Sequence, residues 1–162
     1  MEDLLAIAKD AAIGPLHVGQ TFSETLRIFG NPDHLRFPYD EMFDGTLSYG
    51  PAEIFFRISD NNVFSYLIQL HFFKRSTGRQ LRMSKKFSIL RPPRSTLSYD
   101  RVRDVMADAG VSFKTNSPVD LENGMHPMMQ FNDKVRFYFL RLGHRGGLKL
   151  SYIELGDFRG VL

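Results

Sequence analysis

The sequence has no cysteine and no tryptophan among its 162 residues. Without cysteine the chain has no disulfide, no thiolate nucleophile and no zinc site with sulfur ligands. This composition fits a reducing compartment, and we expect a cytoplasmic protein. The common catalytic signatures are also missing, because the chain contains no GxSxG, P-loop or GxGxxG motif. We therefore expect a protein that is not an enzyme and uses no cofactor.

Long apolar runs are missing as well. No stretch approaches the roughly 18 apolar residues that a membrane span requires. The first residues include Glu2 and Asp3 where a secretory signal would be basic, and Lys9 and Asp10 interrupt the apolar run that follows. We expect neither a signal peptide nor an association with a membrane.

The five histidines do not form a recognisable metal site. None is paired with a second histidine or a carboxylate at a spacing such as HExxH. They are His17, His34, His71, His126 and His144. We expect ordinary surface or partly buried side chains, and no bound metal.

What the chain does contain is the mixture of an ordered globular protein, with 43% hydrophobic and 24% charged residues. Fifteen phenylalanines and six tyrosines favour β-structure, because aromatic rings pack well on pleated, half-buried surfaces. The length allows one domain or two very small ones.

The net charge of +3 is distributed unevenly along the chain. Residues 1–73 hold four basic and ten acidic side chains, a charge of −6. Residues 74–94 hold eight basic and no acidic ones (+8), and residues 95–162 hold nine basic and eight acidic ones (+1). One short segment therefore supplies the basic character, and the overall charge alone does not indicate nucleic-acid binding.

The first half of the chain predicts two helices followed by a β-hairpin. A capping box of Thr21 with Glu24 predicts the start of the second helix, and Gly30 its end. We expect Gly14-Pro15 to end the first helix. The predicted elements are helices over residues 2–12 and 21–29 and strands over 52–58 and 63–73.

The second half repeats this order. Ser98 is the expected N-cap of a helix that ends at Gly110, and the motif Ser65-Tyr66-Leu67 of the first hairpin recurs as Ser151-Tyr152-Ile153. The hairpins are offset by about 80 to 85 residues, enough for one supersecondary unit each. The predicted elements are a helix over residues 98–109 and strands over 128–131, 135–140 and 148–155, with a further strand around 87–90 before this half.

We therefore predict an α+β fold of two related helix-plus-antiparallel-hairpin units packed into one compact domain. The first unit spans residues 1–73, a basic linker spans 74–94, and the second unit spans 95–162. One unit alone could not easily bury both its helix stripe and its sheet face, whereas two units that share a core could.

Three motifs of the first half occur together in a recurring bacterial pattern. They are Gly19-Gln20-Thr21 at a helix start, Gly30-Asn31-Pro32 at a helix stop, and Tyr49-Gly50 before an apolar strand. The chain resembles the small immunity proteins of bacterial toxin systems, which share their α/β unit with beta-lactamase inhibitory protein and with small outer-membrane assembly lipoproteins. Beta-lactamase inhibitory protein is itself a tandem of two such units. The resemblance covers residues 14–73 well and 95–155 loosely.

This resemblance implies an immunity or inhibitor protein that neutralises a cognate bacterial toxin by occluding its active site. The lipoprotein branch would need an N-terminal signal and a lipidated cysteine, and this chain has neither. The motif residues are caps, turns and core positions, so they indicate the fold more than the function.

The loop over residues 37–45 is the predicted partner-binding segment, because it interleaves aromatic side chains with carboxylates. An alternative is that Phe37 and Phe43 fold back onto the core. If the loop is not the interface, the exposed face of the sheet around Tyr66 and Tyr152 is the next candidate. The predicted contact residues are Tyr39, Asp40, Glu41, Met42, Phe43 and Asp44.

An alternative function, a nucleic-acid-binding or regulatory module, would use the basic segment 74–94. Its cations could grip phosphates, and Phe87 could stack on a base. The segment could equally be a solvated linker. Its basic residues are Lys74, Arg75, Arg79, Arg82, Lys85, Lys86, Arg91 and Arg94.

Overall fold

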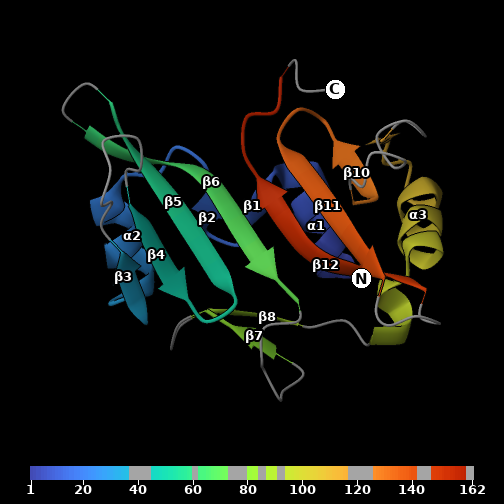
Figure 1. Ribbon diagram of the computed structural model, residues 1–162, viewed down its shortest axis with the longest axis horizontal. Helices are drawn as coiled ribbons and strands as arrows, with labels where there is room; N and C mark the ends of the chain where they lie inside the picture. Colours follow the sequence, from blue (N-terminus) through green and yellow to red (C-terminus); the bar gives the residue numbers. More distant parts are fainter. Residues whose placement is uncertain are drawn as a thin grey trace.

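The computed structural model describes residues 1–36, 45–59, 62–72, 80–83, 87–90, 94–116, 126–141 and 147–159. Over these residues the chain is an α+β protein in which helices pack on an antiparallel sheet (Figure 1), so the predicted fold class is confirmed at this level. The helices are α1 (Glu2–Asp10), α2 (Phe22–Phe29) and α3 (Tyr99–Asp108), with a 3₁₀ turn η1 (Arg94–Leu97) before α3. None of these helices is long and apolar enough to span a membrane.

The main sheet has eight strands in the order β3-β4-β5-β6-β12-β11-β10-β9, and every neighbouring pair is antiparallel. The first four in the chain are β3 (His34–Arg36), β4 (Thr46–Tyr49), β5 (Ala52–Ser59) and β6 (Asn62–His71). The other four are β9 (Lys114–Thr115), β10 (Met128–Phe131), β11 (Val135–Arg141) and β12 (Leu148–Leu155). The two sets meet where β6 pairs with β12, and the longer strands match the predicted ones closely.

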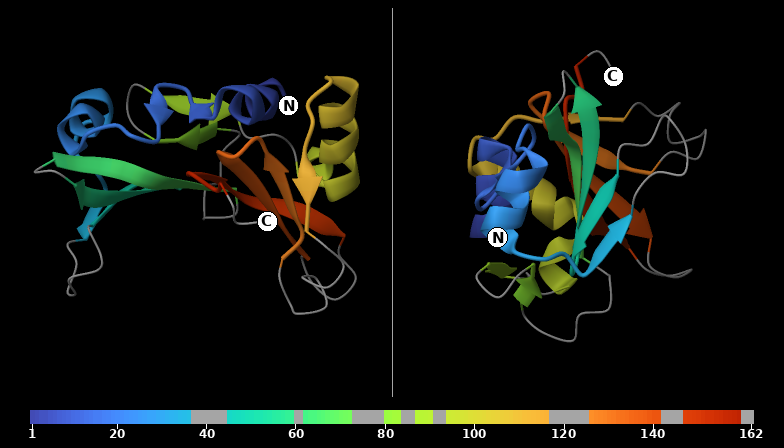
Figure 2. Two further views of the ribbon diagram at one scale, coloured as in Figure 1. Left: turned by 90° about the horizontal axis from the view of Figure 1, so that it is seen from above. Right: turned by 90° about the vertical axis from the view of Figure 1, so that its left-hand side faces the viewer.

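The three helices lie on one side of this sheet, as the two views of Figure 2 show. The core fills the space between them and the inner face of the sheet, because alternate strand residues point to the same side. We call the opposite side the outer face. The largest fully buried side chains are Tyr49, Phe56, Phe72, Phe131, Phe137 and Phe139.

Helix α2 begins and ends where the sequence predicts. The Thr21 hydroxyl accepts a hydrogen bond from the Glu24 backbone N–H at 3.2 Å, and a Glu24 carboxylate oxygen accepts one from the Thr21 N–H at 2.9 Å. These bonds satisfy donors that the first helical turn leaves free. At the other end Gly30 is the C-cap, and its carbonyl accepts a hydrogen bond from the Tyr49 hydroxyl.

Helix α1 is shorter than predicted, so the expectation that Gly14-Pro15 ends it is wrong. The helix stops at Asp10 because Ala11 adopts a left-handed conformation with φ 52°. The next residues form a two-stranded ribbon, β1 (Ala12–Ile13) with β2 (Leu16–His17), in which Gly14 and Pro15 are the turn. Ile13 and Leu16 are fully buried in this ribbon. The burial of these two side chains favours the ribbon over a longer helix α1.

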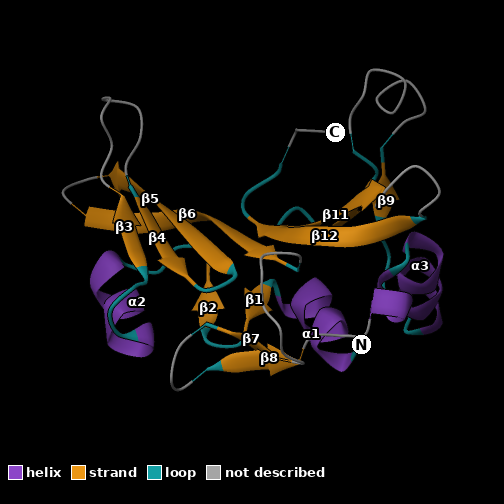
Figure 3. Ribbon diagram, turned by 60° about the horizontal axis from the view of Figure 1, so that its bottom comes forward, coloured by secondary structure: helices purple, strands orange, loops and turns teal. Residues whose placement is uncertain are grey.

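The described part of the predicted linker is packed rather than simply solvated. It forms a second ribbon, β7 (Gln80–Arg82) with β8 (Ser88–Leu90), beside β1, β2 and α1 (Figure 3). Leu81, Met83 and Ile89 are buried and belong to the same hydrophobic core as the helices. The strand predicted around residues 87–90 is therefore present, and this hairpin closes one end of the core.

Candidate interaction surface

The outer face is the largest surface of the sheet that no described helix or ribbon covers (Figure 2). Strand alternation and register decide which side chains it carries, because residues paired across strands share a face. Along the four central strands they include Glu53, Phe55, Arg57, Tyr66, Leu67, Gln69, His71, Arg136, Tyr138, Tyr152 and Glu154.

Three rings form a row across the centre of this face. The Tyr138 and Tyr152 rings are stacked, with centroids 4.5 Å apart and planes inclined by 12°. His71 follows on β6, with its ring centroid 5.8 Å from that of Tyr152. The row crosses the seam where β6 meets β12, so it joins residues that are far apart in the sequence. It offers a flat aromatic surface whose side chains hold one another in place.

Carboxylates lie beside this row. Glu53 Oε2 is 3.3 Å from His71 Nε2, and both side chains are about three-quarters buried. Glu154 Oε1 accepts a hydrogen bond from Gln69 Nε2 at 2.9 Å across the same seam. These pairs order polar side chains in the middle of the outer face.

The phenols of the row titrate above the ordinary range. Burial and, after it, the nearby Glu154 carboxylate raise the pKa of Tyr138 to about 12. Burial and Glu154 raise the pKa of Tyr152 in the same way. Both phenols therefore stay neutral near pH 7 and can donate hydrogen bonds to a bound molecule.

A second cluster occupies the outer face near the end of the β5–β6 hairpin. The Arg57 guanidinium lies 4.6 Å from the centroid of the Tyr66 ring, and the Phe55 ring is 6.4 Å from the same ring. The sheet face around Tyr66 and Tyr152 is the second candidate interface predicted from the sequence. Both tyrosines lie on the outer face, but in different clusters of side chains. The arrangement supplies rings, hydrogen-bond donors and both signs of charge, which suits recognition of a protein surface.

The predicted partner-binding residues lie outside the described residues. They are Tyr39, Asp40, Glu41, Met42, Phe43 and Asp44, and their contact with a partner stays a prediction. The described residues on either side, Arg36 and Thr46, are paired where β3 and β4 run along one edge of the sheet.

The aromatic ring that the nucleic-acid-binding alternative would use to stack on a base is that of Phe87, and this ring packs against the hydrophobic core. Phe87 packs edge-on against Phe29, with centroids 5.9 Å apart. It also lies so close to Gly14 that a Cβ there would be 2.2 Å from the ring. Arg82 is exposed at the end of β7 and Arg94 begins η1. The other basic residues of the segment lie outside the described residues: Lys74, Arg75, Arg79, Lys85, Lys86 and Arg91.

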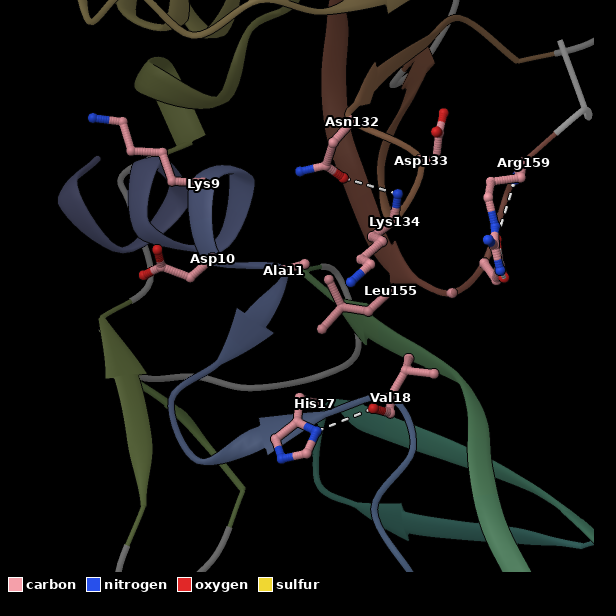
Figure 4. Close-up of a pocket in the computed structure, with 12 residues that line it drawn as sticks. Lys9, Asp10, Ala11, His17, Val18, Asn132, Asp133, Lys134, Leu155 and Arg159 are labelled. Carbon is pink, nitrogen blue, oxygen red and sulfur yellow. Dashed lines mark hydrogen bonds and ion pairs between the residues drawn. The ribbon is translucent and has the colours of Figure 1, made fainter.

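A pocket of about 780 Å³ opens between α1, the end of β2, the β10–β11 turn and the segment after β12 (Figure 4). Lys9, Asp10 and Lys134 line it together with His17. The Arg159 guanidinium bonds the Asp157 carboxylate at its rim and holds the pKa of that carboxyl at about 2. The lining mixes both signs of charge, and no three potential metal ligands cluster in the described part of the chain.

The sequence did not single out Arg136, Gln130 or Phe158, which meet on the outer face. Arg136 Nε donates a hydrogen bond to Gln130 Oε1 at 2.8 Å, and the guanidinium carbon lies 4.1 Å from the centroid of the Phe158 ring. Alternation places Arg136 on the same side of its strand as Tyr138, which was the only available signal. Its neighbours depend on strand pairing and on the chain after β12.

Comparisons with known proteins identify no relative. No family model, no curated protein and no solved structure matches the chain.

Proposed function

We propose that the protein is a binding protein of the immunity or inhibitor kind, which holds a cognate toxin on the outer face of its sheet and blocks the toxin's active site. The observation that carries the proposal is the ordered row of His71, Tyr152 and Tyr138 with Glu53 and Glu154 beside it. Stacked rings add contact area at little further entropy cost, and the fixed carboxylates give charge complementarity to a basic cleft. The predicted partner-binding segment, residues 37–45, lies between β3 and β4 in the sequence and would add further contacts.

We also propose that the two halves are related units. Support comes from irregularities in strand pairing that occur at matching places in both halves, since a regular antiparallel sheet does not require them. The β-hairpin that ends each predicted unit contains a bulge. In β5–β6 the register shifts between Phe55 and Phe56, and Tyr66 is the extra residue. In β11–β12 it shifts between Tyr138 and Phe139, and Ser151 is the extra residue. Bulges are retained as specific features of a family's sheet.

A second correspondence concerns the helix starts. The N-cap residue of α2, Thr21, forms an isolated bridge with Phe64, and the N-cap residue of α3, Ser98, forms one with Lys149. Each bridge lies two residues before the extra residue of the bulge in the same strand. Helix, bridge and bulge thus recur in one order, which supports a tandem duplication and, through it, the resemblance to tandem inhibitors.

The experiment is co-production with the protein encoded next to this chain's gene. If that protein is a toxin, we expect protection of growing cells and a stable complex by titration calorimetry. Tyr152→Ala, Tyr39→Ala and Asp40→Ala should each weaken the complex by about 1–3 kcal/mol. The melting temperature should change little for Tyr39→Ala and Asp40→Ala, whereas Tyr152→Ala also loses its ring contacts with Tyr138 and His71 and is compared only while it stays folded. Arg101→Ala on the exposed side of α3 is the matched control and should leave affinity unchanged.

Two results would refute this proposal. One is the absence of binding and protection with the intact protein. The other is unaltered affinity in a triple variant that lacks Tyr152, Tyr39 and Asp40 and still folds. We further propose a cytoplasmic location, supported by the cysteine-free composition. The nucleic-acid alternative has less support, because Phe87 packs on Phe29.

A further inference from the structure

Arg136 is a buried cation with only neutral contacts among the described residues. Its side chain is 8% exposed, yet the groups around the guanidinium are the Gln130 amide, the Tyr138 phenol and the Phe158 ring. Its Nη2 atom is buried and has no hydrogen-bond partner among these residues. Glu154 is paired with Arg136 in the β11–β12 register, but its carboxylate takes the Gln69 amide, and no ion pair with Arg136 is formed.

This arrangement is costly for a charge. Removing a guanidinium from water costs several kcal/mol, which buried arginines normally offset with a carboxylate and further hydrogen bonds. Here Nε is held by Gln130 and the Tyr138 phenol lies at the guanidinium, so Nη2 is the donor that has no partner among the described residues. Two parallel N–H groups at the Nη edge of a guanidinium match the two oxygens of a carboxylate.

Among the described residues, the ring packed over the Arg136 guanidinium is that of Phe158. Phe158 follows β12 and is 9% exposed, with its backbone N–H bonded to the Asp133 carbonyl at 2.8 Å. Gly156 makes room for the ring, because a Cβ at that position would lie 2.8 Å from it. A shift of this segment would expose the guanidinium without disturbing any of the sheet strands.

We propose that Arg136 is the receptor for a carboxylate presented by an acidic side chain of the bound protein partner, and that Phe158 covers this receptor in the free protein. The partner as the source of the carboxylate rests on the proposed function, whereas the receptor itself does not. The carboxylate replaces the cover, pairs with the Nη edge and supplies the missing counter-charge. The charge pair fixes the orientation of the partner on the outer face.

The receptor is tested without any partner, using acetate as the probe. The Nε–H resonance of Arg136 is followed by nitrogen-15 NMR while acetate replaces chloride at constant ionic strength, and Arg136→Lys identifies the signal. We expect a saturable shift of this resonance in the unmodified protein, with Arg136→Lys used only to assign the signal. In Phe158→Ala acetate should bind about tenfold more tightly if the covered state holds about nine-tenths of the molecules.

Gly156→Ala is the second opening variant, because its methyl group displaces the ring while Phe158 remains. It should also tighten acetate binding. Phe55→Ala removes an outer-face ring far from Arg136 and should leave acetate binding as in the unmodified protein. No saturable shift in the unmodified protein or in either opening variant would overturn the proposal. Binding of inorganic phosphate but not of acetate would overturn its assignment to a carboxylate.

Stability separates a receptor from a purely structural arginine. Arg136→Met with Gln130→Leu removes the charge and its hydrogen-bond partner together, so no buried amide is left unpaired. A receptor predicts an unchanged or higher melting temperature, since a buried unpaired charge is removed. A large fall in melting temperature together with acetate insensitivity would assign Arg136 to the fold alone. Acetate binding without partner binding would keep the receptor and refute the proposed function instead.

Discussion

Two tyrosines on opposite faces of the sheet share a raised pKa for related reasons. Tyr49 lies on the inner face, fully buried, and its hydroxyl donates to the Gly30 carbonyl at 2.9 Å. Burial raises its pKa to about 12, with the Asp33 carboxylate acting in the same direction. Tyr138 reaches about 12 on the outer face, where Glu154 replaces Asp33 as the nearby anion. In both cases the surroundings disfavour the phenolate.

These shifts predict a loss of stability in alkali. Because the pKa of these phenols in the folded protein is raised above the ordinary value of 10.0, the stabilisation is complete below pH 10 and is lost as the pH rises towards 12. Urea denaturation across this range should show the free energy of unfolding falling. Absorbance titration should show Tyr49 and Tyr138 among the phenols that ionise late, and Glu154→Gln should lower the pKa of Tyr138 but not of Tyr49. Native phenols that all ionise at 10.0 would contradict the prediction.

The helices differ in how they begin, although both N-caps were predicted. In α2 the Thr21 side chain and the Glu24 side chain bond one another's backbone N–H groups. The Thr21 backbone N–H and hydroxyl both donate to the Glu24 carboxylate, and these two bonds lower the pKa of that carboxyl. In α3 Ser98 has the extended N-cap conformation but makes no capping hydrogen bond with its side chain.

Because only the N-cap side chain of α2 makes a capping hydrogen bond, replacing each N-cap residue by alanine should lower the stability of the protein by different amounts. Thr21→Ala should lower the free energy of unfolding by about 0.5–2 kcal/mol, because the Glu24 N–H loses its acceptor. Ser98→Ala is the matched control and should cost less. Urea unfolding of the two variants at neutral pH measures both, and an equal loss would mean that the hydroxyl of Ser98 caps α3 after all.

Two neighbouring phenylalanines of β5, Phe55 and Phe56, point to opposite faces of the sheet. Phe56 is 1% exposed in the core and packs edge-on against Phe22, whereas Phe55 lies on the outer face beside Tyr66. Phe56→Ala should therefore cost about 3–5 kcal/mol, as should Phe139→Ala at its fully buried position. Phe55→Ala should cost clearly less. Comparable losses for Phe55 and Phe56 would show that the outer face is covered as fully as the inner one.

At the scale of the whole molecule, one continuous sheet unites the two halves. The central contact is the four-residue pairing of β6 with β12, reinforced by the Gln69–Glu154 hydrogen bond and the His71–Tyr152 ring contact. The described part of the basic segment closes the core instead of standing apart from it.

This arrangement predicts weak binding to nucleic acid. The negative charge of residues 1–73 repels the phosphates that the basic segment would attract. The Phe87 ring packs on Phe29, so it is not free to stack on a base. A band-shift titration with duplex DNA at physiological salt should show no sub-micromolar complex. A tight complex whose affinity falls steeply with added salt would favour the nucleic-acid function over the inhibitor function.

The sequence by itself determined the elements that local chemistry specifies. The capping box defines α2, and the alternation and turn signals place β5, β6, β10, β11 and β12 within a few residues. It missed the early end of α1, where the burial of Ile13 and Leu16 in a ribbon outweighs helix propensity. It also missed β9, which is too short to show any periodicity.

Only the tertiary structure decided the surface. The pairing of β6 with β12 joins residues about 85 positions apart, and no local pattern encodes which strands meet or in which register. That register creates the row of His71, Tyr152 and Tyr138. The burial of Arg136 depends on a ring from beyond the last strand. Local propensity is a property of a segment, whereas a binding face is a property of segments that folding brings together.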